Sequence, residues 1–213
     1  MTDFDDSRLA ELLCARLCHD LAGPVGAAAA GAELVEDSGD DLDAETVALV
    51  AASAAGAAAR LKFFRSAMGP SASAQDAGVV KDLAETYLRT SVSGGMSGIA
   101  LQWRSSLRTL DGDMARLALN LILIVRDSLP RGGTIAVELG AQGPTSLKVQ
   151  GLGEPAKLGD EARLVLCDGR DPTGPRGAHA LFVQRLAARL DGTQLHVAEA
   201  PAEIVLSLRP ADG

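Results

Sequence analysis

The sequence predicts an α+β fold, in which an N-terminal hairpin of two long helices forms a four-helix bundle by dimerisation and an α/β sandwich follows. Two observations predict this architecture. Apolar residues recur every three or four positions through two long N-terminal segments. After a short linker, stretches with strand character alternate with apolar helical stretches. The expected division is 1–70 for the hairpin, 71–78 for the linker and 79–213 for the α/β domain.

The first helix is expected to begin at a cap formed by Asp5, Asp6 or Ser7 and to run to about Asp37. A break of Ser, Gly and Asp follows it. One side of this helix carries an apolar stripe, which is typical of an amphipathic helix that packs against another element. The stripe consists of Leu9, Leu13, Leu17, Leu21, Val25, Ala28, Ala32 and Val35.

The second helix is expected from about residues 41–43 to Gly69 and Pro70, which end it. Its stripe consists of Val47, Val50, Ala54, Ala58, Leu61, Phe64 and Met68. Two long helices joined by a few residues form an αα-hairpin. Such a hairpin cannot shield both stripes from water alone, so we expect a homodimer. The alternative is a monomer whose hairpin packs on its own C-terminal half.

The C-terminal half is expected to form a mixed sheet with helices on one face. Helices are expected over 79–90, 114–129, 161–167 and 177–190, and strands over 99–103, 134–139, 146–150, 194–198 and 203–208. A turn is expected over 140–145. These elements complete the fold class stated above.

Composition limits the function classes. Aromatic residues make up only 3% of the 213 residues, so the core must consist mostly of Ala, Leu and Val. The net charge of −8 argues against nucleic acid or an anionic membrane as the main partner. Three cysteines do not form a disulfide framework, and the acidic N-terminus lacks the features of a signal peptide. We therefore expect a cytoplasmic protein.

His19 is the main candidate for chemistry. Each helical residue advances by about 100°, which places His19 roughly 200° from the apolar stripe, facing outward. Ala15, Ala22 and Gly23 lie on its face and leave space for another protein's active site. On the same face, Arg16 is expected to meet a phosphoryl oxygen through a charge-assisted hydrogen bond.

The chemistry expected of His19 is phosphoryl transfer. A neutral imidazole, with an ordinary pKa of about 6.5, is a good nucleophile near pH 7. The adjacent Asp20 is expected to orient the ring or take its proton, and Pro24 is expected to kink or loosen the helix. The alternative is that His19 is an ordinary surface residue.

Residues 19–24, His-Asp-Leu-Ala-Gly-Pro, resemble the H-box of sensor histidine kinases, in which the histidine accepts the phosphoryl group. The order of a helical hairpin, a linker and an α/β domain is similar to the order of the dimerisation and ATP-binding domains in those kinases. The resemblance implies that the α/β domain has the Bergerat-type fold of a kinase ATP-binding domain.

Several nucleotide-binding residues of the kinases are missing. Asn120 matches the first asparagine of the kinase N-box, but Ile124 stands where the magnesium-binding asparagine is expected. Gly151 stands where an aspartate reads the adenine, and Pro175 and Arg176 replace small residues of the phosphate loop. The resemblance therefore implies a degenerate domain that does not bind ATP productively.

This combination resembles the ChpT-type histidine phosphotransferases of alphaproteobacteria, with the best matches over residues 13–26 and 60–65. The family implies a homodimer that relays phosphoryl groups from the receiver domain of a hybrid histidine kinase to the receiver domains of response regulators. In the best-known case these regulators control the cell cycle. The family also implies no cofactor of its own, because the receiver supplies the Mg²⁺.

A receiver-binding surface is expected around His19. In an antiparallel hairpin that turns near residue 40, the position level with His19 lies near residue 62. The expected receiver-binding residues are Leu12, Ala15, Arg16, Ala22, Gly23, Arg60, Phe63 and Phe64, with His19 and Asp20 as the catalytic pair. The alternative for the two phenylalanines is a core role at the end of the helix, which is favoured for Phe64.

Two other functions remain open from the sequence: a non-catalytic dimeric adaptor that docks receivers, and an active histidine kinase. No metal site is expected, because Cys14, Cys18 and His19 lack a second ligand pair. The cysteines are expected to be buried in helices. His179 and His196 are isolated in the sequence, so surface or packing roles are expected for them.

Overall fold

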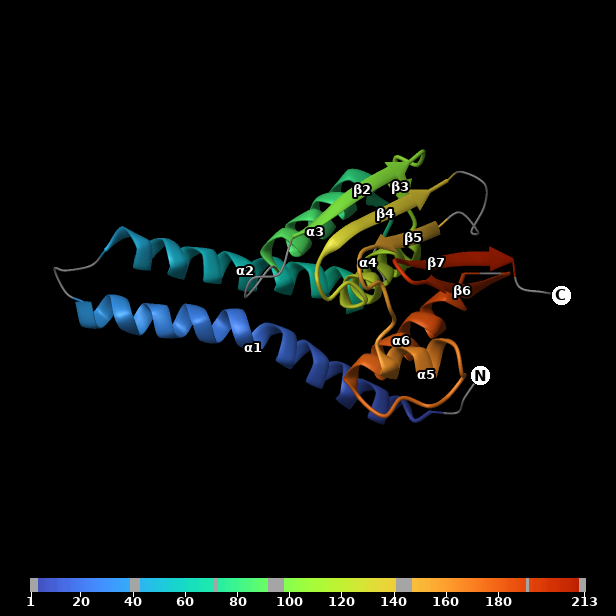
Figure 1. The fold of residues 1–213 in the computed structure, drawn as a ribbon, viewed down its shortest axis with the longest axis horizontal. Coiled ribbons are helices and arrows are strands. Elements are labelled where there is room, and N and C mark those ends of the chain that lie inside the picture. The colour runs from blue at the N-terminus through green and yellow to red at the C-terminus, as the bar shows by residue number, and fades with distance from the viewer. Residues whose placement is uncertain are drawn as a thin grey trace.

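The computed structural model describes residues 4–38, 43–70, 73–91, 98–140, 147–190 and 192–210. Helices α1 (Asp6–Ser38) and α2 (Ala44–Met68) form the expected hairpin, which projects from a compact body as a long arm (Figure 1). Helix α1 is continuous through Pro24. Asp43 caps the start of helix α2, because its carboxylate accepts the backbone N–H of Thr46 at 2.6 Å.

The body is the expected mixed sheet with helices on one face. The strands are β2 (Ile99–Ser105), β4 (Gly133–Leu139), β5 (Leu147–Leu152), β6 (Thr193–Ala200) and β7 (Glu203–Pro210), in the order β2-β4-β5-β7-β6. Strands β2 and β4 pair in parallel, and the other neighbours pair antiparallel. The helices are α3 (Ala77–Thr90), α4 (Gly112–Asp127), α5 (Asp160–Leu166) and α6 (Pro175–Ala187). Helix α4 is almost wholly buried and contacts strands β4, β5 and β7, because its apolar residues cover most of its circumference.

The prediction of a linker over residues 71–78 is only partly correct. Strand β1 (Gln75–Asp76) pairs antiparallel with β3 (Thr109–Leu110), and neither strand was expected from the sequence. Helix α3 begins at Ala77 rather than at residue 79, because the carboxylate of Asp76 caps it by accepting the N–H of Gly78 at 2.8 Å. Residues 71–72 of the expected linker, and most of the expected turn over 140–145, lie outside the described residues.

The base of the arm shares the core of the body. The Phe63 ring stacks on Tyr87 of α3 with centroids 4.0 Å apart, and Phe64 meets both rings edge-on. Leu9 and Leu12 of α1 are buried in the same apolar cluster. Burial of these rings and side chains holds α1 and α2 at a defined position against the body.

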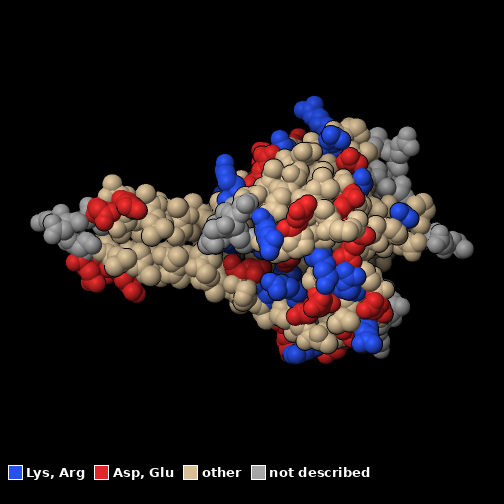
Figure 2. All heavy atoms as spheres, viewed as in Figure 1, with Lys and Arg blue, Asp and Glu red and all other residues tan. Residues whose placement is uncertain are grey.

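The arm exposes apolar residues along its length. They are Val25, Leu34, Val47, Leu49 and Leu61, each about half exposed or more. Figure 2 shows the arm almost free of charge except for acidic side chains near its tip, whereas basic and acidic side chains gather where the arm joins the body. By length and apolar composition α2 also qualifies as a possible membrane span, a test that core helices of soluble proteins pass as well.

Candidate functional site

His19 lies on the solvent side of α1 at the junction of arm and body, and its side chain is 82% exposed. Its Nδ1 is 3.1 Å from Oδ1 of Asp20. An ionised carboxylate can only accept a hydrogen bond, so Nδ1 carries the proton of the neutral ring. That tautomer leaves the lone pair on Nε2, which becomes the nucleophilic atom.

His19 borders two hollows where the arm meets the body. The larger, of about 830 Å³, is lined by residues from α1, α2, α3, α4 and α6. Four arginines line it together with His19: Arg60, Arg89, Arg126 and Arg176. The smaller, of about 310 Å³, is also lined by His19 and Arg176. A concentration of cations around an imidazole attracts phosphate groups and acidic partners.

Several residues predicted for this site do lie in it. Asp20, Gly23 and Arg60 line the larger hollow with His19, and Ala15 lines the smaller one. Ala22 is exposed next to them on α1. The helical spacing and the antiparallel hairpin were sufficient to bring these residues together.

Four residues predicted to bind the receiver are buried within the protomer, and for the three that lie in the core the prediction is wrong. Leu12, Phe63 and Phe64 belong to the core of the body, so the core role considered for the phenylalanines holds for both rings. Arg16 is buried as well, because its face of α1 lies against the body, where it pairs with Asp127. Arg16 nevertheless lines the smaller hollow beside His19, where its guanidinium is paired with Asp127 and Asp20.

Cys14, Cys18 and Cys167 are exposed free thiols, so the expectation of buried cysteines is also wrong. His179 has the predicted packing role. It is fully buried, and its Nε2 is 2.8 Å from Oδ1 of Asn120. Asn120 in turn donates to the backbone carbonyl of Ala67 at 2.7 Å. Together they tie the end of α2 to helices α4 and α6.

Sequence reasoning missed several residues at the site, among them Arg89 of α3, Arg126 and Asp127 at the end of α4, and Glu161 in α5. Asp127 lies 2.5 Å from the guanidinium of Arg16, although 111 positions separate the two residues in the chain. Glu161 lines the smaller hollow. Neither periodicity nor a local motif can predict the pairing of Arg16 with Asp127, because this pairing depends on how the body packs against the arm.

The region that resembles the kinase adenine site is filled by protein. A Cβ on Gly151 would lie 2.6 Å from Cγ1 of Val125 and 2.9 Å from Cγ2 of Ile204, so this position has no space for an aspartate. Ile124, in place of the magnesium-binding asparagine, is buried. The aliphatic packing here leaves neither an adenine-reading carboxylate nor a metal ligand at these two positions.

The region that resembles the phosphate loop holds a carboxylate of the protein itself. Oε2 of Glu161 accepts the backbone N–H groups of Arg176 at 3.1 Å and Gly177 at 3.0 Å, at the start of α6. Backbone N–H groups at a helix N-terminus favour an anion. A Cβ on Gly174 would lie 2.6 Å from the same oxygen, so glycine is needed for this close approach.

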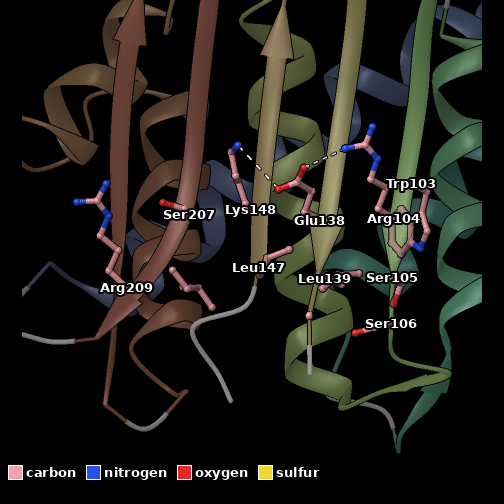
Figure 3. Close-up of a pocket in the computed structure, with 12 residues that line it drawn as sticks. Trp103, Arg104, Ser105, Ser106, Glu138, Leu139, Leu147, Lys148, Ser207 and Arg209 are labelled. Atoms are coloured by element: carbon pink, nitrogen blue, oxygen red, sulfur yellow. Dashed lines mark hydrogen bonds and ion pairs between the residues drawn. The ribbon is translucent and has the colours of Figure 1, made fainter. Parts of the chain in front are cut away.

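A third hollow, of about 840 Å³, lies on the face of the sheet that the helices leave open (Figure 3). Glu138 of β4 lies there between Arg104 of β2, at 3.5 Å, and Lys148 of β5, at 3.9 Å. The three side chains are substantially exposed. This hollow shares no lining residue with the two beside His19.

Comparison with known proteins agrees with this geometry. The family described as "Histidine phosphotransferase C-terminal domain" matches residues 82–202. Protein phosphotransferase ChpT of Brucella abortus (strain 2308) is 34% identical over 209 residues, covering 93% of this chain and 94% of that protein. A bacterial phosphotransferase solved at 1.7 Å resolution superposes with a TM-score of 0.81 and 28% identity, covering 98% of both chains.

The chain therefore belongs to the histidine phosphotransferases, which carry phosphoryl groups in phosphorelays, and among them to the ChpT type. The matched family range falls within residues 79–213, the predicted second domain. The predicted α+β fold, a helical hairpin followed by a mixed sheet with helices on one face, is confirmed over nearly the whole chain.

Proposed function

We propose that His19 is the residue that carries the phosphoryl group, and that it receives this group from the aspartyl phosphate of a docked receiver domain. The observation that supports this assignment is the exposed His19–Asp20 pair in a hollow lined by four arginines. The two other histidines are less suitable. His179 is fully buried and His196 is half-buried on strand β6, away from both hollows.

In the proposed reaction, Nε2 of His19 attacks the phosphorus atom of the aspartyl phosphate. The N–P bond forms as the bond between phosphorus and the aspartyl oxygen breaks, and the receiver carboxylate leaves with the electron pair. The ring keeps its proton on Nδ1 and becomes positively charged. The carboxylate of Asp20, 3.1 Å away, stabilises that charge. Transfer to the next receiver is the reverse of these steps.

In this proposal the arginines around His19 interact with the receiver domain as well as with the phosphoryl group. A receiver presents an acidic pocket, and the basic hollow favours its approach and offsets the charge of the transferring group. Arg60 and Arg176 are the proposed docking residues, with Ala15, Ala22 and Gly23 as the small residues that allow close approach. In this proposal the receiver supplies the Mg²⁺ for the transfer.

We propose that the protein takes its phosphoryl group from a receiver and not from ATP. The aliphatic packing around Gly151 and the carboxylate of Glu161 at the start of α6 support this proposal. The packing around Gly151 fills the space of an adenine contact. The Glu161 carboxylate accepts backbone N–H groups that would otherwise be open to a phosphate.

We further propose that the functional unit is a homodimer in the cytoplasm. A largely apolar groove of about 540 Å³ runs between α1 and α2. The predicted stripe residues Leu17, Leu21, Ala58, Leu61, Phe64 and Met68 line it, together with Lys62, Arg65 and Gly69. A second copy of the hairpin would cover this groove and complete a four-helix bundle. Each dimer would then present two His19 sites.

A transfer assay tests the assignment of His19. The protein is incubated with a receiver carrying a ³²P-labelled aspartyl phosphate, and in parallel with γ-³²P ATP alone. We expect the wild type to take label from the receiver only, and His19→Ala to take none. His196→Ala is the matched control and should behave as wild type. Label on His19→Ala would refute the assignment, and label from ATP would show kinase activity instead.

A further inference from the structure

Arg16 is a buried cation that joins the arm to the body directly behind His19. It lies one helical turn before Asp20 on α1, and its side chain is only 6% exposed. A buried guanidinium needs carboxylate partners, because desolvation of an unpaired charge is costly. Its partners come from both parts of the molecule: Asp20 on the arm and Asp127 at the end of α4 in the body.

These residues form a series of charged contacts that leads from the body to the imidazole, in which the link between Arg16 and Asp20 is an ion pair without a hydrogen bond at Nε. Nη2 of Arg16 lies 2.5 Å from Oδ2 of Asp127, and its Nε lies 3.6 Å from Oδ2 of Asp20. The other oxygen of Asp20, Oδ1, is 3.1 Å from Nδ1 of His19. Asp20 therefore uses both carboxylate oxygens: Oδ2 faces the guanidinium of Arg16, and Oδ1 faces the imidazole of His19.

Asp127 is itself held in place. Its second oxygen, Oδ1, accepts from Nη1 of Arg126 at 2.9 Å, and its side chain is 16% exposed. Arg126 also donates to the backbone carbonyl of Ser91 at 3.5 Å. Asp127 is thus fixed by the body on one oxygen and fixes Arg16 with the other.

We propose that Asp127 is a positioning residue for phosphoryl transfer: through Arg16 it orients the Asp20 carboxylate, which keeps His19 in the tautomer with a free Nε2. This inference rests on the proposed role of His19. It gives the degenerate α/β domain a role in transfer, because Asp127 of that domain holds Arg16 in place. The phosphoryl-carrying histidine of the arm then depends on a residue of the body that touches neither the substrate nor the ring.

The expected consequence of losing Asp127 follows from the geometry. Without it, Arg16 keeps one carboxylate partner and moves towards both oxygens of Asp20. Oδ1 then turns away from His19, and the ring exchanges between tautomers. The Nε2–H tautomer has no lone pair on Nε2 and cannot attack phosphorus through that atom, so transfer slows. Loss of a partner that orients a reacting group typically costs about 10-fold or more in activity.

The variant for the test is Asp127→Asn, which keeps the shape and removes the charge. The matched control is Asp113→Asn, because Asp113 on the same helix pairs at 3.0 Å with Arg116, another buried guanidinium, and lines neither hollow beside His19. We measure the single-turnover rate of transfer from a labelled receiver, and the His19 tautomer by ¹⁵N NMR in the absence of receiver. We expect about 10-fold slower transfer and a shift towards Nε2–H for Asp127→Asn only.

A second variant is needed in case Asp127→Asn misfolds, because that substitution leaves the buried guanidinium of Arg16 with one carboxylate partner fewer. Arg16→Gln combined with Asp127→Asn removes both charges, and the same two measurements are made on it. We expect slow transfer and the Nε2–H shift here too, because nothing then holds Asp20. In an Asp20→Asn background, Asp127→Asn should cause no further slowing if it acts through Asp20.

Wild-type transfer and an unchanged tautomer in folded Asp127→Asn and in the double variant would overturn the inference. Equal slowing by Asp113→Asn would overturn it too, because the effect would then be one of general stability. Failure of the inference is distinct from failure of the proposed function. In the first case His19→Ala is inactive while Asp127→Asn is normal, and in the second His19→Ala still accepts label.

Discussion

The geometry at His19 depends on Asp20, its neighbour on α1, and on Arg16, which contacts the Asp20 carboxylate. The backbone of α1 places Asp20 next to the ring, but adjacent residues on a helix do not face each other by default. The observed 3.1 Å approach therefore requires the carboxylate to be turned towards Nδ1. Arg16 occupies the other side of that carboxylate, so the orientation of the pair is a property of tertiary packing.

We expect His179 to make the stability of the protein depend on pH. Burial, together with the nearby cation of Arg16, holds the pKa of His179 well below its usual 6.5. The unfolded chain therefore binds this proton more tightly than the folded chain. As the pH falls below about 6.5, the group lowers the free energy of unfolding by up to about 1.4 kcal/mol per pH unit, and above that pH its contribution is constant.

The His179→Gln variant tests this response, because the amide can still meet Asn120 but does not titrate. Urea unfolding between pH 7.5 and pH 5 should show a smaller loss of stability on acidification than in the wild type. Its stability at pH 7.5 provides the reference for any packing defect. Equal slopes for the two proteins would show that His179 takes no part in the response.

At the scale of elements, periodicity and local signals predicted most of what forms. The outward position of His19 follows from the 3.6-residue repeat, and the strands and helices of the body follow from their apolar patterns. The short pair β1 and β3 was missed, because two residues carry no periodicity. The burial of Phe63 was missed because the outer face of α2 at this level is covered by α3, a contact that only docking of the body creates.

Helix α4 and strand β5 show why the nucleotide site of a kinase cannot be restored by one residue. Gly151→Asp reintroduces the adenine-reading carboxylate in sequence, but its Cβ would overlap Val125 and Ile204. Overpacking costs about 1–3 kcal/mol, and burial of a carboxylate adds to this. We expect Gly151→Asp to lower the free energy of unfolding by more than about 2 kcal/mol and to bind no ATP in calorimetry.

The matched control for that variant is Gly159→Asp, at the N-cap of α5. A Cβ there meets nothing within 4 Å, and an aspartate is favoured at such a position, so stability should be unchanged or slightly higher. If Gly151→Asp were as stable as the control, the clash with Val125 and Ile204 would be contradicted. If it bound ATP, the region between α4 and β5 would be a nucleotide site.

At the scale of the whole molecule, the exposed stripe of the arm predicts self-association. Leu61 is 58% exposed and lines the groove between α1 and α2 that a second hairpin would cover. A buried leucine contributes about 1.5–3 kcal/mol, and a glutamate in its place would add a buried charge at each copy. We expect Leu61→Glu to be monomeric by light scattering at concentrations where the wild type is dimeric.

Val79→Glu is the control for this measurement, because Val79 is equally exposed but lies on α3 of the body. It should remain dimeric. A wild type that is monomeric at micromolar concentration, or a Leu61→Glu variant that stays dimeric, would contradict assembly through the arm. Recovery of the wild type only from membranes would instead point to the other use of an apolar helix such as α2.

The central claim is that the phosphoryl group is carried on Nε2 of His19. The most direct measurement is NMR of the protein after it has reacted with a phosphorylated receiver in the absence of ATP. With ¹⁵N-labelled histidine, the ³¹P–¹⁵N correlation identifies the nitrogen and the residue that hold the phosphorus. We predict a single phosphorylated site, Nε2 of His19. A phosphorus bound to Nδ1, or to any other residue, would contradict it.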